Sequence, residues 1–361
     1  MSAALVRLAL RRTLAPSVCA ASAALLALLL SRDWAGPNAL LEAAEAGTSA
    51  SLAARGLLRE GVWTLLALTL LPLLVARAAR TVPAWRAGEG EWLGSRAAGR
   101  GSILASTWIG TFAGGAILLL LAALAVELRA AAIGPGAPTL RRGASIPIPS
   151  TAWIGSGAPL EWTLADPRAP AGARARLELG FGMDAGSTAE VELRAARAGG
   201  REHASRARIG SRGSIEVLLP EGPGDLRFEL RCTRPGTRAY VASDEVEVWI
   251  PCAGDAAASA AILVRLLLAH AVLSALAIGL SAWISAPTAV LALLAAWCTA
   301  WLADRPPAWL PGADLFGALD VAGAGRVPAA LDPLSFAAGA VLSAAGLLLA
   351  ARGISSWRGS T

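Results

Sequence analysis

Lysine is absent from this 361-residue chain, so all 32 of its lysine-plus-arginine side chains are arginines. The phosphate-binding loop of nucleotide hydrolases needs a lysine that reaches the terminal phosphates. The chain therefore cannot supply a Walker-type ATPase site of its own. Any work that is driven by ATP requires a separate partner that binds the nucleotide.

Patterns that bind metals or perform catalysis are also missing from the sequence. The only histidines are His203 and His270, and neither a Cys-x-x-Cys nor a His-Glu-x-x-His motif occurs. These are the spacings that commonly hold zinc. We therefore expect a protein that is not an enzyme and that binds no cofactor in this chain.

Long apolar runs are abundant instead, at residues 14–31, 62–76, 103–128, 258–283, 287–303 and 334–351. Most of them approach the 17 to 25 residues or so that cross a hydrocarbon core of roughly 30 Å. A backbone in lipid must be helical, because no water is present to satisfy its polar groups. The sequence predicts a polytopic α-helical membrane protein with six transmembrane helices, the first an uncleaved anchor rather than a signal peptide.

Arginines in the short segments between runs predict the orientation of the chain. They gather before the first run, between the second and third, and after the sixth: Arg7, Arg11, Arg12, Arg77, Arg80, Arg86, Arg96, Arg100, Arg352 and Arg358. These segments and both termini are therefore predicted to be cytoplasmic. The net charge of +6 follows from this topology rather than from nucleic-acid binding, since no basic stripe with interleaved aromatics lies outside the membrane flanks.

The arginine bias, together with abundant alanine, glycine and leucine, indicates the codon usage of a GC-rich bacterial genome. The predicted location is therefore the inner membrane of a bacterium. Segments 32–61, 133–252 and 304–333 would face outward.

Residues 133–252, between the third and fourth runs, change to strict alternation of apolar and polar side chains. Leu177 and Leu179 alternate with Arg176 and Glu178, and the pattern recurs at 160–164, 190–194, 215–219, 226–231 and 246–250. A period of two with one apolar face is typical of half-buried strands. The segment is predicted to be an all-β sandwich outside the membrane, between residues 1–132 with three helices and residues 253–361 with three more.

Two cysteines, Cys232 and Cys252, lie in this β segment, where an oxidising compartment would permit a bridge. If their strands form a simple hairpin, however, symmetric pairing would separate the cysteines beyond the Cα distance of about 7 Å that a disulfide allows. The sequence leaves the bridge open. Cys19 and Cys298 are interpreted as packing residues within apolar runs.

The cytoplasmic loop 77–102 carries the most specific functional signal. It contains acidic Glu89 and Glu91, the apolar pair Trp92 and Leu93, and then Arg100, with Ile103, Leu104 and Gly110 in the following helix. In this order it resembles the coupling loop of ABC-2 type ABC transporter permeases, although Trp92 and Ala97 replace residues that are often threonine and proline. Segments 279–289 and 306–316 are similar to two further parts of that family, but the β segment is not.

This resemblance implies a short coupling helix that docks on a separate ABC ATP-binding subunit through Arg86, Glu89, Glu91, Trp92, Leu93, Arg96 and Arg100. It also implies a second permease subunit, identical or different, with which the chain lines an export path. Charged residues around an apolar aromatic anchor suit such an interface. The alternative is an interfacial helix that lies on anionic membrane lipid with its arginines toward the headgroups.

Arg265 and His270 are ionisable residues within the fourth apolar run. Intramembrane charges often mark a pathway, so this pair is a hypothetical polar site. Alternatively, Arg265 lies at the outer interface, with His270 about one helical turn below it and paired with a neighbouring helix. The glycines within 110–115 are expected to allow close packing of helices.

The sequence as a whole thus predicts the permease subunit of an ATP-driven exporter. Its β segment would contact a substrate or an envelope protein. The alternative function is a non-transport membrane scaffold or sensor whose β segment binds an envelope partner.

Overall fold

The computed structural model describes most of the chain, in two compact units. One unit comprises Met1–Ala137 with Asp255–Thr361, and the other comprises Pro138–Gly254. The described residues are 3–32, 34, 50–85, 100–133, 139–147, 153–154, 159–164, 172–180, 189–197, 202–209, 212–222, 224–233, 239–241, 245–252, 256–302, 315–323, 326–328 and 331–356.

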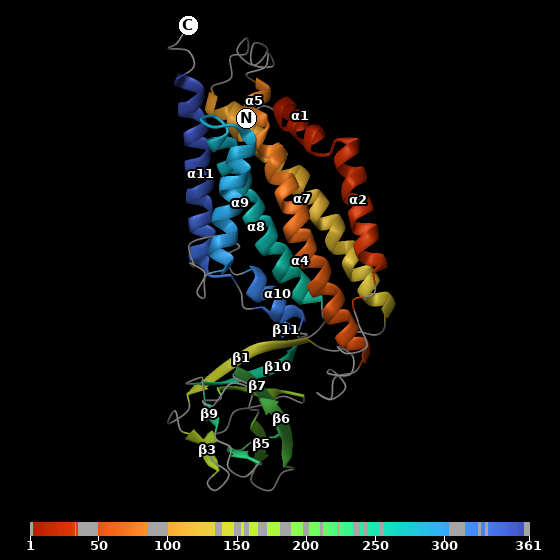
Figure 1. Ribbon diagram of the computed structural model, residues 1–361, viewed down its shortest axis with the longest axis vertical. Helices are drawn as coiled ribbons and strands as arrows, with labels where there is room; N and C mark the ends of the chain where they lie inside the picture. Colours follow the sequence, from red (N-terminus) through yellow and green to blue (C-terminus); the bar gives the residue numbers. More distant parts are fainter. Residues whose placement is uncertain are drawn as a thin grey trace. The chain divides into compact units, whose positions relative to one another are not determined.

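Helices build the first unit, and the longer ones run lengthwise through it (Figure 1). Their bounds are α1 Ala3–Thr13, α2 Pro16–Ser31, α4 Ala50–Ala79, α5 Thr81–Ala84, α7 Arg100–Ile133, α8 Ala256–Leu280, α9 Ala286–Leu302, α10 Leu315–Gly323 and α11 Pro333–Ser356, with the short strand β11 at Arg326–Val327. One hydrophobic cluster includes buried side chains of most of these helices.

Four helical segments are long and apolar enough to cross a membrane: Ala54–Ala84, Gly101–Ile133, Ala256–Leu280 and Pro333–Ile354. Helices α1 and α2 are bent by 46° at a short break and make a fifth candidate if the pair is one span. Helix α9 is apolar, but its 17 residues extend only about 25 Å at 1.5 Å per residue. Four or five candidate spans are therefore present in the described part of the chain, where the sequence predicted six.

Helix α4 begins earlier than the sequence predicted. The apolar run 62–76 was expected to follow an outer loop, but residues 50–61 are the first turns of the same helix. Arg55 and Arg59 in these turns are buried, so their charges belong to the interior of the helical unit. Pro72 lies inside α4 without ending it, which membrane helices tolerate because neighbouring groups satisfy the freed backbone.

The backbones of α8 and α11 touch directly at two glycines. A Cβ atom on Gly346 would lie 2.6 Å from the carbonyl oxygen of Ala275, and one on Gly279 would overlap the carbonyl of Gly346. Small residues of this kind let membrane helices approach closely, since packing is a main source of their association.

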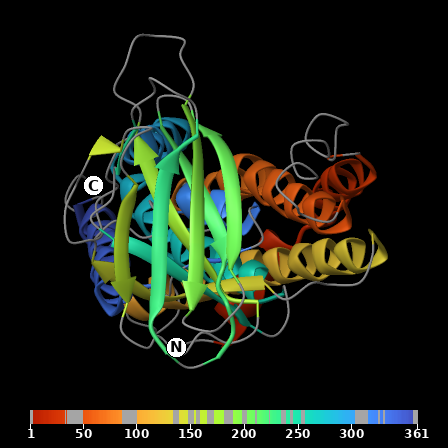
Figure 2. The ribbon, with the colours of Figure 1, turned by 90° about the horizontal axis from the view of Figure 1, so that it is seen from below.

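Strands build the second unit and form two antiparallel sheets (Figure 2). In one sheet β1 (Thr139–Pro147), β10 (Glu245–Cys252), β4 (Arg174–Gly180), β9 (Ala239–Val241) and β2 (Trp153–Ile154) follow one another, and β7 (Arg212–Leu218) also pairs with β4. The other has the order β3 (Leu160–Leu164), β8 (Leu226–Cys232), β5 (Ala189–Arg197) and β6 (His203–Ile209).

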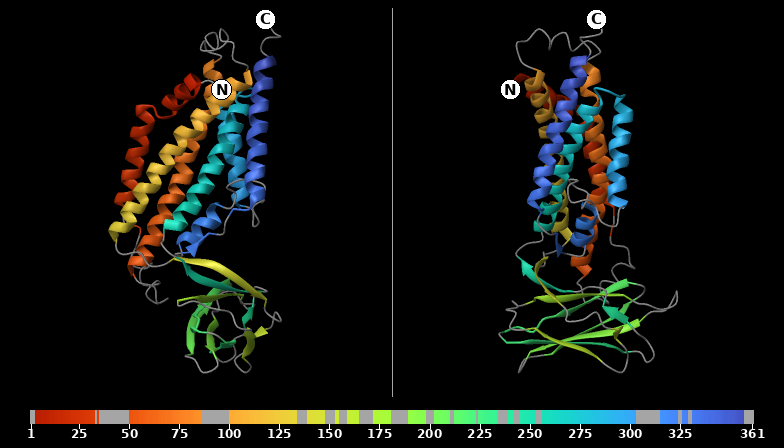
Figure 3. Two further views of the ribbon diagram at one scale, coloured as in Figure 1. Left: turned by 180° about the vertical axis from the view of Figure 1, so that it is seen from behind. Right: turned by 90° about the vertical axis from the view of Figure 1, so that its left-hand side faces the viewer.

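Buried side chains from both sheets belong to a single hydrophobic cluster. Leu177 of β4 and Phe228 of β8 are completely buried in it, and the Trp162 ring stacks on Phe228 with centroids 5.2 Å apart. Figure 3 shows the strands of this unit as two layers. The strands predicted from alternation at 160–164, 190–194, 215–219, 226–231 and 246–250 are thereby confirmed.

Strands β8 and β10, which end at Cys232 and Cys252, lie in different sheets. They do not form the simple hairpin that was considered from the sequence. β8 pairs instead with β3 and β5, and β10 pairs with β1 and β4.

Glu192 breaks the expected pattern of β5, because it is buried on the face that alternation assigns to solvent. Its carboxylate accepts two hydrogen bonds from Arg231, at 2.8 and 2.6 Å, and Arg194 and Arg206 each approach to 3.4 Å. Burial alone would raise the pKa of Glu192, but the Arg231 hydrogen bond and the surrounding arginine charges outweigh it and lower the pKa.

This cluster predicts that the β unit loses stability in acid. The folded state lowers the pKa of Glu192, so its charged carboxylate adds to the free energy of unfolding at pH values above its ordinary pKa of 4.5. This stabilisation is lost as the pH falls through the lower pKa of the folded state. We expect Glu192→Gln to lower the free energy of unfolding by about 1–2 kcal/mol at pH 7. The variant should also lose less stability than the wild type when the pH is lowered. Near-ultraviolet circular dichroism of the full-length protein against pH and temperature measures both effects.

Glu161→Gln is the matched control, since Glu161 forms an exposed ion pair with Arg227 in the same sheet. Exposed pairs contribute roughly 0–1 kcal/mol. If both variants behave alike in acid, the buried cluster does not stabilise the unit in the way described.

Candidate functional site

Most of the predicted contact residues for an ATPase subunit, namely Arg86, Glu89, Glu91, Trp92, Leu93 and Arg96, lie outside the described residues. The structure describes the two flanks of this segment. One flank ends at Trp85, just after α5, and the other begins with the backbone of Arg100, the first residue of α7. The coupling-loop assignment stays a prediction from sequence.

The two ionisable residues predicted within the fourth apolar run both lie on α8 and are both buried. Arg265 lies nine residues after the start of the helix, and its Nη1 donates to the carbonyl oxygen of Ala261 at 3.2 Å. His270 stacks on Phe112 of α7 with ring centroids 5.8 Å apart. Arg265 therefore contacts its own helix, while His270 packs on a neighbouring one. Their joint role as one polar site stays a prediction from sequence.

The glycines of α7 determine how closely other elements approach it. A Cβ on Gly110 would lie 2.7 Å from Cβ of Ala9, and one on Gly114 would lie 2.6 Å from Cβ of Thr13, both on α1. A Cβ on Gly115 would lie 2.7 Å from Cδ2 of His270. The sequence prediction that these glycines serve close helix packing is confirmed.

A partly buried ion pair joins α4 to α7, and sequence reasoning missed it. Arg59 donates from Nε to Glu127 Oε1 at 2.9 Å and from Nη2 to Oε2 at 2.6 Å. The hydroxyl of Ser259 on α8 also donates to Glu127, and the indole nitrogen of Trp63 lies 3.4 Å from that hydroxyl. Three helices thus meet at one carboxylate. Glu127 and Ser259 lie close in sequence to the two ends of the β unit, Pro138 and Gly254.

A signal for this cluster existed in the sequence. Glu127 is the only acidic residue in the apolar run 103–128. An isolated charge in such a run normally needs a partner inside the protein. The partner was hidden because Arg59 was assigned to a loop.

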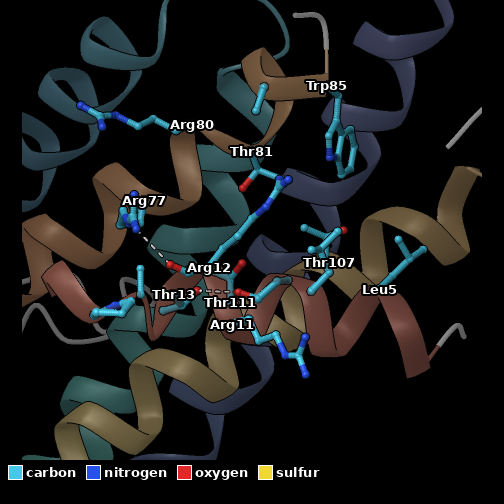
Figure 4. Close-up of a pocket in the computed structure, with 15 residues that line it drawn as sticks. Leu5, Arg11, Arg12, Thr13, Arg77, Arg80, Thr81, Trp85, Thr107 and Thr111 are labelled. Atoms are coloured by element: carbon cyan, nitrogen blue, oxygen red, sulfur yellow. Dashed lines mark hydrogen bonds between the residues drawn. The ribbon is translucent and has the colours of Figure 1, made fainter. Parts of the chain in front are cut away.

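A basic cavity of about 790 Å³ lies at the other end of the helical unit, between α1, the end of α4, α5 and α7 (Figure 4). Four of its lining residues are arginines and none of the lining residues that the structure describes is acidic. The lining comprises Leu5, Leu8, Ala9, Arg11, Arg12, Thr13, Ala15, Pro16, Arg77, Arg80, Thr81, Ala84, Trp85, Thr107 and Thr111.

Arginines of two separate segments line this cavity. Arg11 and Arg12 come from the last turn of α1, and Arg77 and Arg80 come from the end of α4. Nη2 of Arg77 donates to the backbone carbonyl of Arg12 at 3.0 Å, and the same carbonyl accepts from the backbone N–H of Ala15 at 3.3 Å. The geometry therefore provides a concave, cationic surface beside the predicted coupling loop.

Comparison with known proteins adds no relative: no family model matches the chain, and neither does any curated protein or solved structure.

Proposed function

We propose that this chain is the permease subunit of an ATP-driven ABC-2 type exporter, with ATP bound and hydrolysed by a separate ABC ATP-binding subunit. The observation that carries the proposal is the order of residues from Glu89 to Gly110, which runs from the segment between two long apolar helices into the start of the second helix. The lack of lysine requires that the ATPase be a different chain. Docking would use Trp92 and Leu93 as an apolar anchor.

The arrangement of the arginines supports the orientation on which this proposal depends. Arg11 and Arg12 precede the first predicted span and Arg77 and Arg80 follow the second, yet all four line one cavity. Segments that share a membrane face should meet in this way, and the positive-inside rule assigns that face to the cytoplasm. In the proposed topology the run 14–31, which contains α2, is the first span, α9 is a short sixth span, and both termini are cytoplasmic.

The β unit is proposed to be a sandwich on the outer face of a bacterial inner membrane. Its two sheets bury side chains in one common cluster, as the layers of a sandwich do. There it would contact the exported substrate or an envelope protein. A second permease subunit would complete the path across the membrane.

The β unit also favours the second candidate function. It comprises Pro138–Gly254, a large part of the chain, and it has no counterpart in the permease core that the loop resembles. A membrane scaffold or sensor would use such a unit to bind an envelope partner without transport. Such a protein would not need an ATPase subunit.

Co-purification from the native host tests the proposal. The detergent-solubilised wild-type chain is expected to retain an ATPase with a Walker motif, identified by mass spectrometry. The double variant Glu91→Arg, Trp92→Ala should lose it, whereas Glu221→Arg, an exposed change in the β unit, should not. If a folded wild-type chain retains no ATPase, or if the double variant retains as much, the permease proposal is wrong.

A further inference from the structure

The partly buried ion pair lies at one end of three neighbouring helices of the helical unit (Figure 1). Arg59 is near the start of α4, Glu127 is near the end of α7, and Ser259 is in the first turn of α8. Along the chain, the β unit follows α7 and precedes α8. The cluster therefore joins the two helices between which the β unit is inserted, and it joins both of them to α4.

The hydrogen bonds described in this cluster run from one helix to another. Arg59 of α4 donates twice to the carboxylate of Glu127 on α7. The hydroxyl of Ser259 on α8 donates to the same carboxylate, and it accepts from the indole N–H of Trp63 on α4. The start of α8 is thereby bonded to α7 directly and to α4 through Trp63.

Stability alone does not account for a charged cluster at this place. A buried ion pair often stabilises a protein no more than apolar residues of similar size, because both charges lose their water. Hydrogen bonds differ from apolar contacts in that water can replace them. The Glu127 side chain is 25% exposed, against 3% for Arg59, so water reaches the carboxylate. Water can therefore take over the bond that Ser259 makes when α8 moves.

The other end of α8 is held by contacts that water cannot replace. A Cβ on Gly279 would overlap the carbonyl of Gly346, so the backbones of α8 and α11 touch there. Between the two ends, the ring of His270 lies directly against Gly115 of α7. Such packed contacts do not yield gradually. Helix α8 thus has one end that is fixed by packing and one end whose contacts include replaceable hydrogen bonds.

We propose that Arg59, Glu127 and Ser259 form a latch, which holds the start of α8 against α4 and α7 and which opens without unfolding of the helical unit. Opening breaks the bond between Ser259 and Glu127, water takes the place of the hydroxyl, and Arg59 stays paired with the carboxylate. In the proposed topology this end of α8 faces outward. The latch requires neither an ATPase nor a substrate, so its test is separate from that of the proposed function.

Cysteine labelling of the full-length protein in neutral detergent tests the latch. In a background without the four native cysteines, the probes are Ala258→Cys beside Ser259 and Ala277→Cys towards the other end of α8. Both alanines are buried, with exposed fractions of 1% and 0%. A soluble maleimide therefore reports how often the structure opens around each probe. Labelling takes place at a temperature at which circular dichroism shows the variants to be folded.

Two substitutions loosen the latch in different ways. Glu127→Gln removes the charge of the acceptor, and Ser259→Ala removes the donor on α8 while leaving the ion pair in place. Ser274→Ala is the matched control, because the hydroxyl of Ser274 donates to the carbonyl of Ala271 on the same helix. The control thus removes a buried serine hydroxyl from α8 and leaves the bonds of the latch intact.

We expect each test variant to raise the labelling rate at position 258 about tenfold, the effect of losing one hydrogen bond to a charged group. Ser274→Ala should leave that rate almost unchanged. Position 277 should stay unlabelled over the same time in every variant, because its exposure requires the whole unit to unfold. Equal labelling at both positions, or an unchanged rate at 258 in Ser259→Ala, would show that the cluster is a static support and that no latch exists. Ser259→Ala decides the question alone if Glu127→Gln does not fold.

Discussion

Glu127→Gln is expected to destabilise the helical unit by about 2–3 kcal/mol, because it removes the charged acceptor of the hydrogen bonds that a buried arginine donates. The Arg59 side chain is only 3% exposed, against 25% for Glu127, and it donates two hydrogen bonds to the carboxylate. Glutamine has nearly the same shape, but it removes the carboxylate charge to which Arg59 donates two hydrogen bonds. The bond from Ser259 would be weakened as well.

The double variant Arg59→Met, Glu127→Leu separates the charge effect from packing. Replacing a buried ion pair by apolar residues of similar size is often neutral or stabilising, so we expect it to recover most of the loss. Thermal unfolding in neutral detergent, followed by circular dichroism, measures the series. If the double variant is as unstable as Glu127→Gln, the loss of stability does not come from the lost carboxylate charge, and this explanation is wrong.

Gly346→Leu should be comparably damaging, since it forces α8 and α11 apart. Even a single Cβ at this position would lie 2.6 Å from the carbonyl oxygen of Ala275, and backbone cannot give way as a flexible side chain can. We expect a loss of about 3 kcal/mol for leucine, at the upper end of overpacking effects. Gly346→Ala should give a smaller loss in the same direction.

Gly317→Leu on α10 is the control, because a Cβ there meets nothing within 4 Å. It should leave the unfolding temperature almost unchanged. If Gly346→Leu is equally harmless, α8 and α11 do not pack with their backbones in contact.

Local patterns in the sequence predicted local structure well. Each of the six apolar runs coincides with a helix, and alternation located β4, β5 and β8. The spacing of apolar residues within one segment indicates which of its faces is buried, so these elements can be predicted without knowledge of their neighbours. Strand β6, with its exposed arginines and small apolar residues, has a weaker signal and was missed.

The polar clusters were not predictable, because their partners come from distant segments. Alternation alone predicts that Glu192 faces solvent. In the structure it is buried beneath Arg231 and Arg206 of adjacent strands, which both donate to its carboxylate. Arg59 and Glu127 are 68 residues apart, and the arginine cavity joins α1 to the end of α4. Only the tertiary arrangement brings these charges together, although Glu127, an isolated charge in an apolar run, was a signal that a partner exists.

The sidedness of the chain underlies the whole account, and cysteine labelling in bacterial spheroplasts measures it directly. In a background without Cys19, Cys232, Cys252 and Cys298, single cysteines are introduced as Ala204→Cys in β6, Ser95→Cys in the predicted coupling loop and Ser360→Cys near the C-terminus. A membrane-impermeant maleimide should label the cysteine at 204 in intact spheroplasts and those at 95 and 360 only after permeabilisation. Labelling of positions 95 and 204 from the same side would contradict the proposed permease topology, and outside labelling of position 360 would show that α9 does not cross the membrane.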